Sequence, residues 1–175
     1  AQMGAPSFWR STERYAVLGA AEYRDRIEAG LRSAGSLLDR LLGTKPGERT
    51  RYPPDLVGRL AEKLYLLDAA CAGMDAAEPH DAFVLVEAGR DRGEAPMTCD
   101  EFARRLATMY RTWATKRHMQ LAVLDDGDPG GRRPFRAMLA VSGFAAYRIL
   151  RPEAGLHVFE SPRAAGGFLR SRVRV

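Results

Sequence analysis

Two long stretches in the first half of the chain carry apolar residues at spacings of three and four, the period of a helix that packs on one side. The first stripe, in residues 12–43, comprises Ala16, Ala20, Tyr23, Ile27, Leu31, Ala34, Leu38 and Leu41. The second stripe, after Pro53 and Pro54, comprises Leu56, Leu60, Leu64, Leu67, Cys71 and Met74. Both are expected to pack as core, so the pattern predicts an antiparallel helical hairpin.

The ends of these helices carry matching signals. Ser11 or Thr12 is suited to cap the first helix, and Gly43 is suited to end it. The second helix opens on the two prolines, which a first helical turn tolerates. These signals support a long hairpin that begins near residue 12.

The pattern changes after Glu78-Pro79-His80, where short apolar runs alternate with turn residues. Strands are predicted at residues 81–87, 119–124, 135–143 and 168–175, and His157 is expected to begin another. Thr98 and Glu101 form a capping box for a helix. Its predicted apolar face comprises Phe102, Leu106, Met109, Tyr110 and Trp113. Residues 144–155 read as a short helix and turn, and Ser161-Pro162 reads as a second turn.

The last predicted strand alternates cleanly, so its side chains divide between two faces. One face carries Leu169, Ser171, Val173 and Val175, and the other carries Phe168, Arg170, Arg172 and Arg174. The expected fold class is α+β. A helical hairpin at 6–78 is followed by a small mixed domain at 81–175, with a mostly antiparallel sheet and one packing helix.

The formal net charge of +5 is unevenly distributed along the chain. Residues 1–80 contain as many acidic as basic residues, so the whole excess lies in residues 81–175. A one-sided basic excess favours a polyanionic partner such as RNA, although a charge of this size also serves solubility. The candidate basic contacts are Arg132, Arg133, Arg172 and Arg174.

Residues with catalytic or metal-binding chemistry do not form a recognisable site. His80, His118 and His157 have no neighbours at metal-ligand spacing. The clustered carboxylates Asp125, Asp126 and Asp128 read as turn formers, because an EF-hand loop would need a glutamate where Arg136 stands. The sequence therefore predicts no enzyme activity, no metal and no cofactor.

Compartment signals point to the cytoplasm. No apolar run approaches the length of a membrane span, and the first residues lack the pattern of a signal peptide. Cys71 and Cys99 form no disulfide framework, as is typical of a reducing compartment. A cytoplasmic protein without a membrane partner or a small-molecule substrate is expected.

A series of short motifs suggests a family. They comprise Ala88, Gly89, Gly93, Glu94 and Ala95, then Met109, Tyr110, Trp113 and Ala114, then Ser142, Gly143, Tyr147, Glu153, Gly155, Leu156 and His157. In this order and spacing, roughly residues 6–175 resemble the PCRF and decoding region of bacterial class I peptide chain release factors, nearest the UGA-reading type.

The resemblance implies a codon-reading loop with altered side chains. The family's Ser-Pro-Phe reading tripeptide corresponds to Ser161, Pro162 and Arg163, and its two glycines correspond to Gly166 and Gly167. Arg170 stands where the family has a codon-facing histidine. An arginine can still contact phosphate or stack on a base, but it changes the donors and acceptors available for base readout.

The resemblance also implies that one function is missing from these residues. The family hydrolyses peptidyl-tRNA through a Gly-Gly-Gln loop, whereas the Gly-Gly pairs here are followed by Arg132 and Phe168. The chain is therefore expected not to catalyse release. An uncovered sheet face or edge is expected near residues 168–175, where the family's chain would continue.

Two functions remain open on these grounds. The first is a ribosome- or RNA-associated translation module without hydrolase activity, whose partner is rRNA or mRNA. The second is a repurposed PCRF domain that binds proteins through the helical hairpin or the C-terminal sheet edge. In that role it would be part of, or an adaptor to, a larger ATPase or chaperone system.

Overall fold

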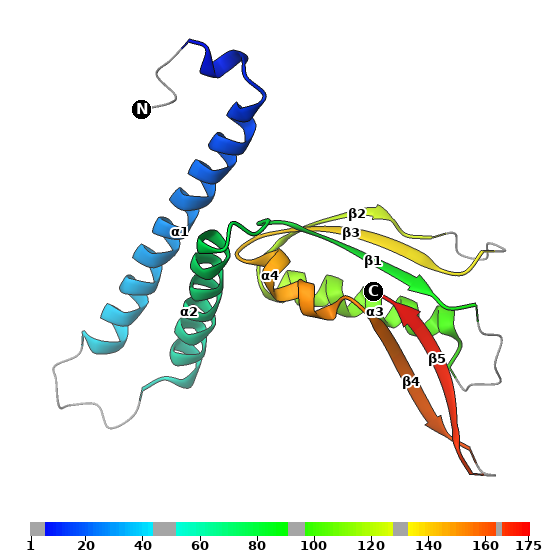
Figure 1. The fold of residues 1–175 in the computed structure, drawn as a ribbon. Helices are drawn as coiled ribbons and strands as arrows, with labels where there is room; N and C mark the ends of the chain where they lie inside the picture. Colours follow the sequence, from blue (N-terminus) through cyan, green and yellow to red (C-terminus); the bar gives the residue numbers. More distant parts are fainter. Residues whose placement is uncertain (1–5, 44–51, 91–96, 128–132, 164–165) are drawn as a thin grey trace. The chain divides into compact units, whose positions relative to one another are not determined.

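A computed structural model of the chain describes residues 6–43, 52–90, 97–127, 133–163 and 166–175. It forms two compact units, Ala1–Cys71 and Ala72–Val175 (Figure 1). The elements in chain order are η2 (Phe8–Arg10), α1 (Glu13–Leu42), α2 (Pro54–Asp75), β1 (Ala82–Ala88), α3 (Cys99–Lys116), β2 (Gln120–Asp125), β3 (Arg136–Ser142), α4 (Ala146–Leu150), η3 (Arg151–Glu153), β4 (Leu156–Pro162) and β5 (Phe168–Arg174). The α+β class predicted from the sequence is confirmed.

The ends of α1 follow from its cap residues. Ser11 Oγ accepts a hydrogen bond of 3.1 Å from the backbone N–H of Glu13. The side chain of Ser11, rather than that of Thr12, therefore satisfies a backbone N–H group at the start of α1. At the other end, Gly43 N–H donates to the Asp39 carbonyl at 2.6 Å. A Cβ on Gly43 would lie 2.5 Å from that carbonyl oxygen. The predicted glycine stop is confirmed.

The hairpin buries only part of its two predicted stripes. Of the first stripe, Tyr23, Ile27, Ala34 and Leu41 are buried, and of the second only Leu67 is. The α2 helix also buries Leu66 and Ala70, which were not part of the predicted stripe. Leu31, Leu38 and Leu64 were expected in the core and are instead 44–50% exposed. The cause is the helical period of 3.6 residues, which rotates alternate members of a three-and-four stripe toward its edge.

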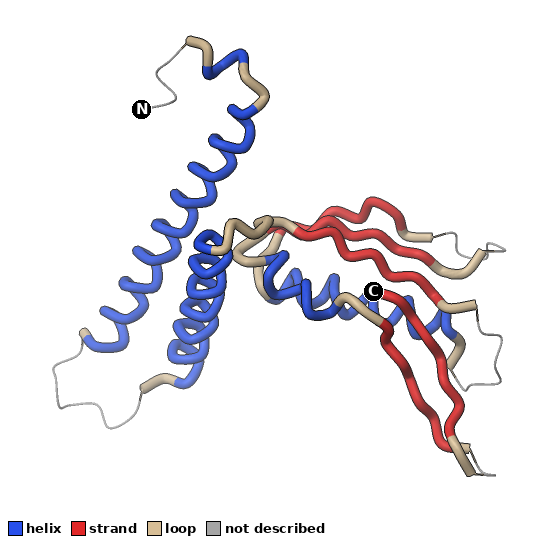
Figure 2. Tube along the Cα trace, in the orientation of Figure 1, coloured by secondary structure: helices blue, strands red, loops and turns tan. Residues whose placement is uncertain are grey.

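The second unit is built on a five-stranded antiparallel sheet with the order β2-β3-β1-β5-β4 (Figures 1 and 2). Its central strand, β1, pairs with β3 over six positions, from Ala82↔Val141 to Glu87↔Arg136. On its other side β1 pairs with β5 at only two positions, Glu87↔Arg174 and Ala88↔Val173. The largest fully buried side chains in the described strands are those of Val86, Leu139, Val141, Ser171 and Val173.

One face of this sheet packs against α3, which contacts β1, β2, β3 and β5 (Figure 1). The predicted capping box is present: Glu101 N–H donates to Thr98 Oγ1 at 3.1 Å, and Thr98 N–H donates to Glu101 Oε2 at 2.8 Å. The buried residues of α3 include Leu106, Tyr110 and three alanines at positions 103, 107 and 114. Met109, expected in the core, is 46% exposed. The alanines are the smallest side chains on the packed face, so this helix can lie close to the sheet.

The β4–β5 hairpin departs from the sequence prediction in two ways. Ser161 and Pro162 do not form a turn, because β4 continues through both and pairs them with Leu169 and Phe168. The free edge expected at residues 168–175 is not on β5, which lies between β1 and β4; β4 forms that edge. The expected uncovered face is present, since Phe168 is 60% exposed.

The junction between β1 and β5 is extended by Gly89. Its backbone N–H donates to the Arg172 carbonyl at 2.8 Å, just beyond the last ladder pair. A Cβ on Gly89 would lie 2.7 Å from that same oxygen, closer than side chains ordinarily approach backbone. Glycine is therefore required here by close approach, and not by a special backbone conformation.

Tyr110 links α3 to η3. Its hydroxyl donates to Glu153 Oε2 at 3.1 Å, and the Glu153 carbonyl contacts His157 Nε2 at 2.9 Å. Burial, and then the charge and hydrogen bond of Glu153, raise the pKa of Tyr110 well above its usual value. The phenol consequently stays protonated in the folded protein at pH values where an exposed tyrosine ionises.

Replacing Gly89 by alanine is expected to destabilise the second unit by on the order of 1–3 kcal/mol, because the methyl group displaces the Arg172 carbonyl. Urea unfolding followed by circular dichroism measures this change. Gly73→Ala in α2 is the matched control, since its Cβ would meet atoms only at 3.7 Å and beyond. Equal unfolding midpoints for the two variants would show that the close approach is unimportant.

Replacing Tyr110 by phenylalanine should change how stability depends on alkaline pH. Above about pH 10 an unfolded tyrosine loses its proton while folded Tyr110 keeps it, so the wild type loses up to about 1.4 kcal/mol per pH unit. Tyr110→Phe lacks this loss, and the wild type's advantage should shrink between pH 8 and pH 11. Urea unfolding of both proteins at the two pH values tests this, and a constant difference would contradict it.

Candidate nucleic-acid interface

The β4–β5 hairpin closes in a short loop that depends on two glycines. Arg163 N–H donates to the Gly167 carbonyl at 3.0 Å, and Gly166 N–H donates to the Arg163 carbonyl at 3.1 Å. Gly166 and Gly167 both have φ of +86°, a conformation that strains residues with a side chain. Glycine is therefore favoured at both positions, directly before β5.

The side chains predicted to read a codon are distributed over both faces of the hairpin. Ser161 is buried on the face that packs toward α3, whereas Pro162 and Arg163 are exposed. Arg170 is exposed, but its Nε donates to Glu160 Oε1 on the neighbouring strand at 2.7 Å. This ion pair lies in solvent and contributes at most about 1 kcal/mol, yet it directs the guanidinium along the sheet.

The outer face of β5 carries the arginines predicted as basic contacts. Here the outer face means the sheet surface opposite α3, and its β5 residues are Phe168, Arg170, Arg172 and Arg174. The alternation expected from the sequence is thereby confirmed. Across the ladder, Arg172 lies opposite Val158 and Arg174 opposite Leu156, both exposed apolar residues of β4.

A second basic group lies beside this face, where β1 and β3 meet. An open cavity of about 430 Å³ is lined by Arg90, Arg133, Arg136, Phe135 and residues 87, 88 and 134. The predicted contact Arg133 belongs to this group, while the predicted contact Arg132 lies outside the described residues.

In the strand register, Glu87 lies between the two basic groups. Glu87 pairs in the ladder with Arg136 on β3 and with Arg174 on β5. Arg136 Nε approaches Glu87 Oε1 at 3.4 Å. Arg90 and Arg136 were not among the predicted contacts. The alternation of residues 135–143 indicates that Arg136 faces outward, but the strand order that places it near Arg174 cannot be read from the sequence.

Phe135 is held in place beneath the second group. Its backbone N–H donates to Asp100 Oδ1 at 3.0 Å, and the Arg104 guanidinium stacks 4.3 Å from its ring centroid. A cation positioned over an aromatic face in this way is favourable by roughly 0.5–1 kcal/mol. The start of β3 is thus anchored to the first turns of α3.

The start of α3 also holds β5. Ser171 Oγ donates to the Met97 carbonyl, and Arg172 N–H contacts Cys99 Sγ at 3.3 Å. Ser171 is buried while its two arginine neighbours are exposed. These contacts fix which face of β5 points to solvent, and so they position the arginines.

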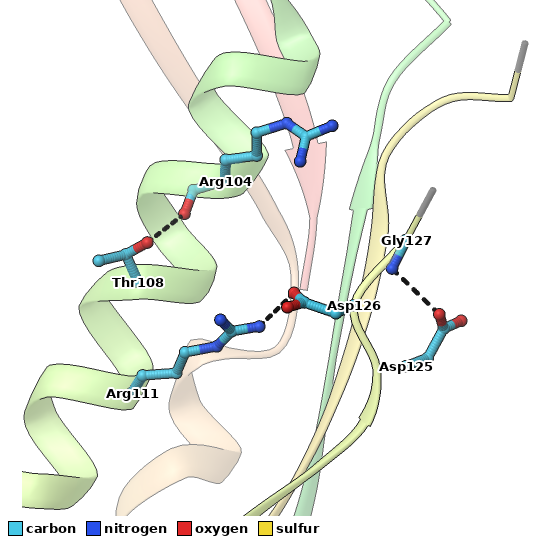
Figure 3. Close-up of polar contacts among 6 residues, drawn as sticks. All are labelled: Arg104, Thr108, Arg111, Asp125, Asp126 and Gly127. Carbon is cyan, nitrogen blue, oxygen red and sulfur yellow. Dashed lines mark hydrogen bonds and ion pairs between the residues drawn. The ribbon is translucent and has the colours of Figure 1, made fainter. Parts of the chain in front are cut away.

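Of the clustered aspartates that the structure describes, Asp125 acts as a turn former, whereas Asp126 forms an ion pair. Asp125 Oδ1 accepts a hydrogen bond of 3.1 Å from Gly127 N–H, and Asp126 pairs with Arg111 of α3 (Figure 3). Asp128 lies outside the described residues. Within the described residues no group of three histidine, cysteine, aspartate or glutamate side chains could hold a metal ion.

His157 and the cysteines have local roles. The His157 ring contacts the Glu153 carbonyl, as described for the Tyr110 link. Neither Cys71 nor Cys99 is in a disulfide bond. No helix in the described part of the chain is long and apolar enough to cross a membrane.

Comparisons with known proteins agree on one family. The PCRF domain model matches residues 60–160, more than half of the chain. Peptide chain release factor 2 of Proteus mirabilis strain HI4320 is 27% identical over 179 aligned positions, which cover 95% of this chain and 47% of the relative. The chain therefore spans about half the length of that curated relative.

Among solved structures, RF2 of Thermus thermophilus aligns with 99% of this chain and 53% of its own, at 23% identity and a TM-score of 0.47. The motifs that first suggested the family all lie within the matched range. Residues 93–95 lie outside the described residues, and the others lie on or beside β1, α3, β3 and the segment from α4 to β4. The chain belongs to the PCRF domain family and is a relative of the bacterial class I peptide chain release factors.

Proposed function

We propose that this chain is a cytoplasmic, ribosome-associated translation module of the release-factor type that has no peptidyl-tRNA hydrolase activity of its own. Family membership supports a role in translation. The observation that carries the proposal is the β4–β5 hairpin, in which Gly166 and Gly167 both have positive φ. The resemblance assigns these two glycines to the family's codon-reading loop.

The changed side chains of this hairpin favour binding without codon discrimination. Ser161 is buried, so its hydroxyl is turned away from a partner at the outer face. Arg170, which replaces the family's histidine, is paired with Glu160. Base readout needs donors and acceptors placed against a base edge, and neither residue supplies them in this arrangement.

The absence of hydrolysis is proposed for these 175 residues alone. They contain no Gly-Gly-Gln, the sequence that the resemblance assigns to the release step. The curated relative is about twice as long as the part that this chain matches. Binding and hydrolysis can therefore be measured separately on this chain.

A single sedimentation experiment tests the binding part. The chain should co-sediment with 70S ribosomes, and equally with ribosomes carrying UGA or a sense codon in the A site. Because arginines contribute to the contact, the affinity should fall steeply between about 50 and 200 mM salt. No binding at low salt would refute ribosome association, and a strong UGA preference would refute the loss of readout.

A peptidyl-tRNA hydrolysis assay tests the second part. With ribosomes carrying formyl-methionyl-tRNA and UGA, the chain should release no more formyl-methionine than buffer does. A release factor 2 serves as the positive control. Release above background that disappears when the chain is heat-inactivated would contradict the proposal.

A second function is favoured by one specific observation, the exposed leucines of the helical hairpin. Leu31, Leu38 and Leu64 are each 44–50% exposed, together with Val57 at 43%. Apolar residues that recur along a helix in this way suit a protein partner. A pull-down that returns specific proteins and no ribosomal subunits would favour this protein-binding role over the ribosomal one.

A further inference from the structure

The outer face of the sheet combines two properties that seldom occur together on a solvated surface. It carries large exposed apolar residues, with Phe83 69%, Leu156 63%, Phe168 60% and Val158 42% exposed. Alongside them run the arginines of β5 and Arg136 of β3. Exposed aromatic residues beside a basic stripe are the features by which sheets bind unpaired nucleic acid.

The charge of this face is strongly one-sided. Arg136, Arg170, Arg172 and Arg174 lie on it, with Glu87 and Glu160 as the acidic residues at their ladder positions. The cavity beside it adds Arg90 and Arg133. Among the described residues of this face and cavity, these six guanidinium groups and two carboxylates give a net positive charge, which is complementary to a polyanion.

The spacing of the β5 arginines narrows the class of polyanion. Alternate residues on one strand lie about 6.6 Å apart, so Arg170, Arg172 and Arg174 follow one another along β5 at that repeat. This repeat resembles the distance between successive phosphates of an extended single strand. Phe168 stands at the loop end of the row, where an unpaired base could stack on its ring.

We propose that the outer face of the sheet binds single-stranded RNA. The phosphates follow the row of β5 arginines, and an unpaired base stacks on Phe168. This inference rests on the proposed function and deepens it, because it assigns RNA contact to the sheet face and not to the codon-loop side chains. Arg136 and the arginines of the neighbouring cavity extend the path of the strand across β1 and β3.

The inference predicts a defined binding behaviour for the isolated chain. It should bind a fluorescent oligo-uridine, and the logarithm of its affinity should fall linearly with the logarithm of salt concentration. Arg172→Gln combined with Arg174→Gln should reduce that salt slope by about 1.4, since each phosphate contact on a single strand contributes about 0.7. Arg26→Gln combined with Arg59→Gln removes the same charge from exposed helix positions and should leave the slope unchanged.

The aromatic contact has its own test. Phe168→Ala should weaken oligo-uridine binding roughly ten-fold while leaving the salt slope unchanged, because it removes stacking and no charge. Phe168→Trp should retain binding and show fluorescence quenching when RNA is added. If Phe168→Trp binds and Phe168→Ala does not, the loss comes from the missing aromatic contact and not from a misfolded hairpin.

Several results would overturn the inference. Oligo-uridine affinity that is unchanged in both the arginine and the phenylalanine variants would place RNA elsewhere. If polyglutamate binds as tightly as oligo-uridine, the face is a general polyanion surface and not an RNA site. If duplex RNA binds as tightly as oligo-uridine, an unpaired base does not stack on Phe168. A chain that co-sediments with ribosomes but does not bind oligo-uridine would refute this inference while leaving the proposed function intact.

Discussion

The arrangement of the second unit depends on the short junction between β1 and β5. These strands share two ladder pairs and the Gly89–Arg172 hydrogen bond, whereas β1 and β3 share six pairs. The whole β4–β5 hairpin joins the sheet through this junction and through the contacts of residues 97–99 with β5. Its position is thus set by these polar contacts near Ser171 and Arg172 and by packing on α3, where the rings of Phe102 and Phe159 are in contact.

This junction also orders the surface chemistry. Burial of Ser171 and Val173 against α3 forces Arg170, Arg172 and Arg174 to the opposite face, because side chains alternate along a strand. Because Glu87 pairs with both Arg136 and Arg174, the arginines of β3 and β5 lie on one continuous basic surface. The same packing that stabilises the unit therefore creates a positively charged face.

Periodicity predicted the elements well where local signals were strong. The Thr98–Glu101 capping box, the Gly43 stop and the alternation of the last strand were all confirmed. Ser161 and Pro162 were assigned to a turn because both residues favour turns. In the structure they end β4, where proline is tolerated because this strand lies at the sheet edge.

The features that could not be predicted from the sequence are those that depend on strand register and strand order. The ion pair between Arg170 and Glu160 joins residues ten positions apart, and it follows from the exact pairing of β4 with β5. The proximity of Arg133 and Arg136 to Arg174 depends on the strand order, which places β1 between β3 and β5. The exposure of Leu31 and Leu38 likewise depends on how far each stripe rotates away from its partner helix.

The central claim is that the outer face of this PCRF domain contacts RNA when the chain is bound to a ribosome. Ultraviolet crosslinking of the ribosome-bound chain, followed by mass spectrometry of nucleotide-linked peptides, measures that contact directly. The account predicts RNA adducts on peptides that contain Phe168 or β4 residues of the outer face. Adducts confined to α1 and α2, or crosslinks to ribosomal proteins alone, would contradict it.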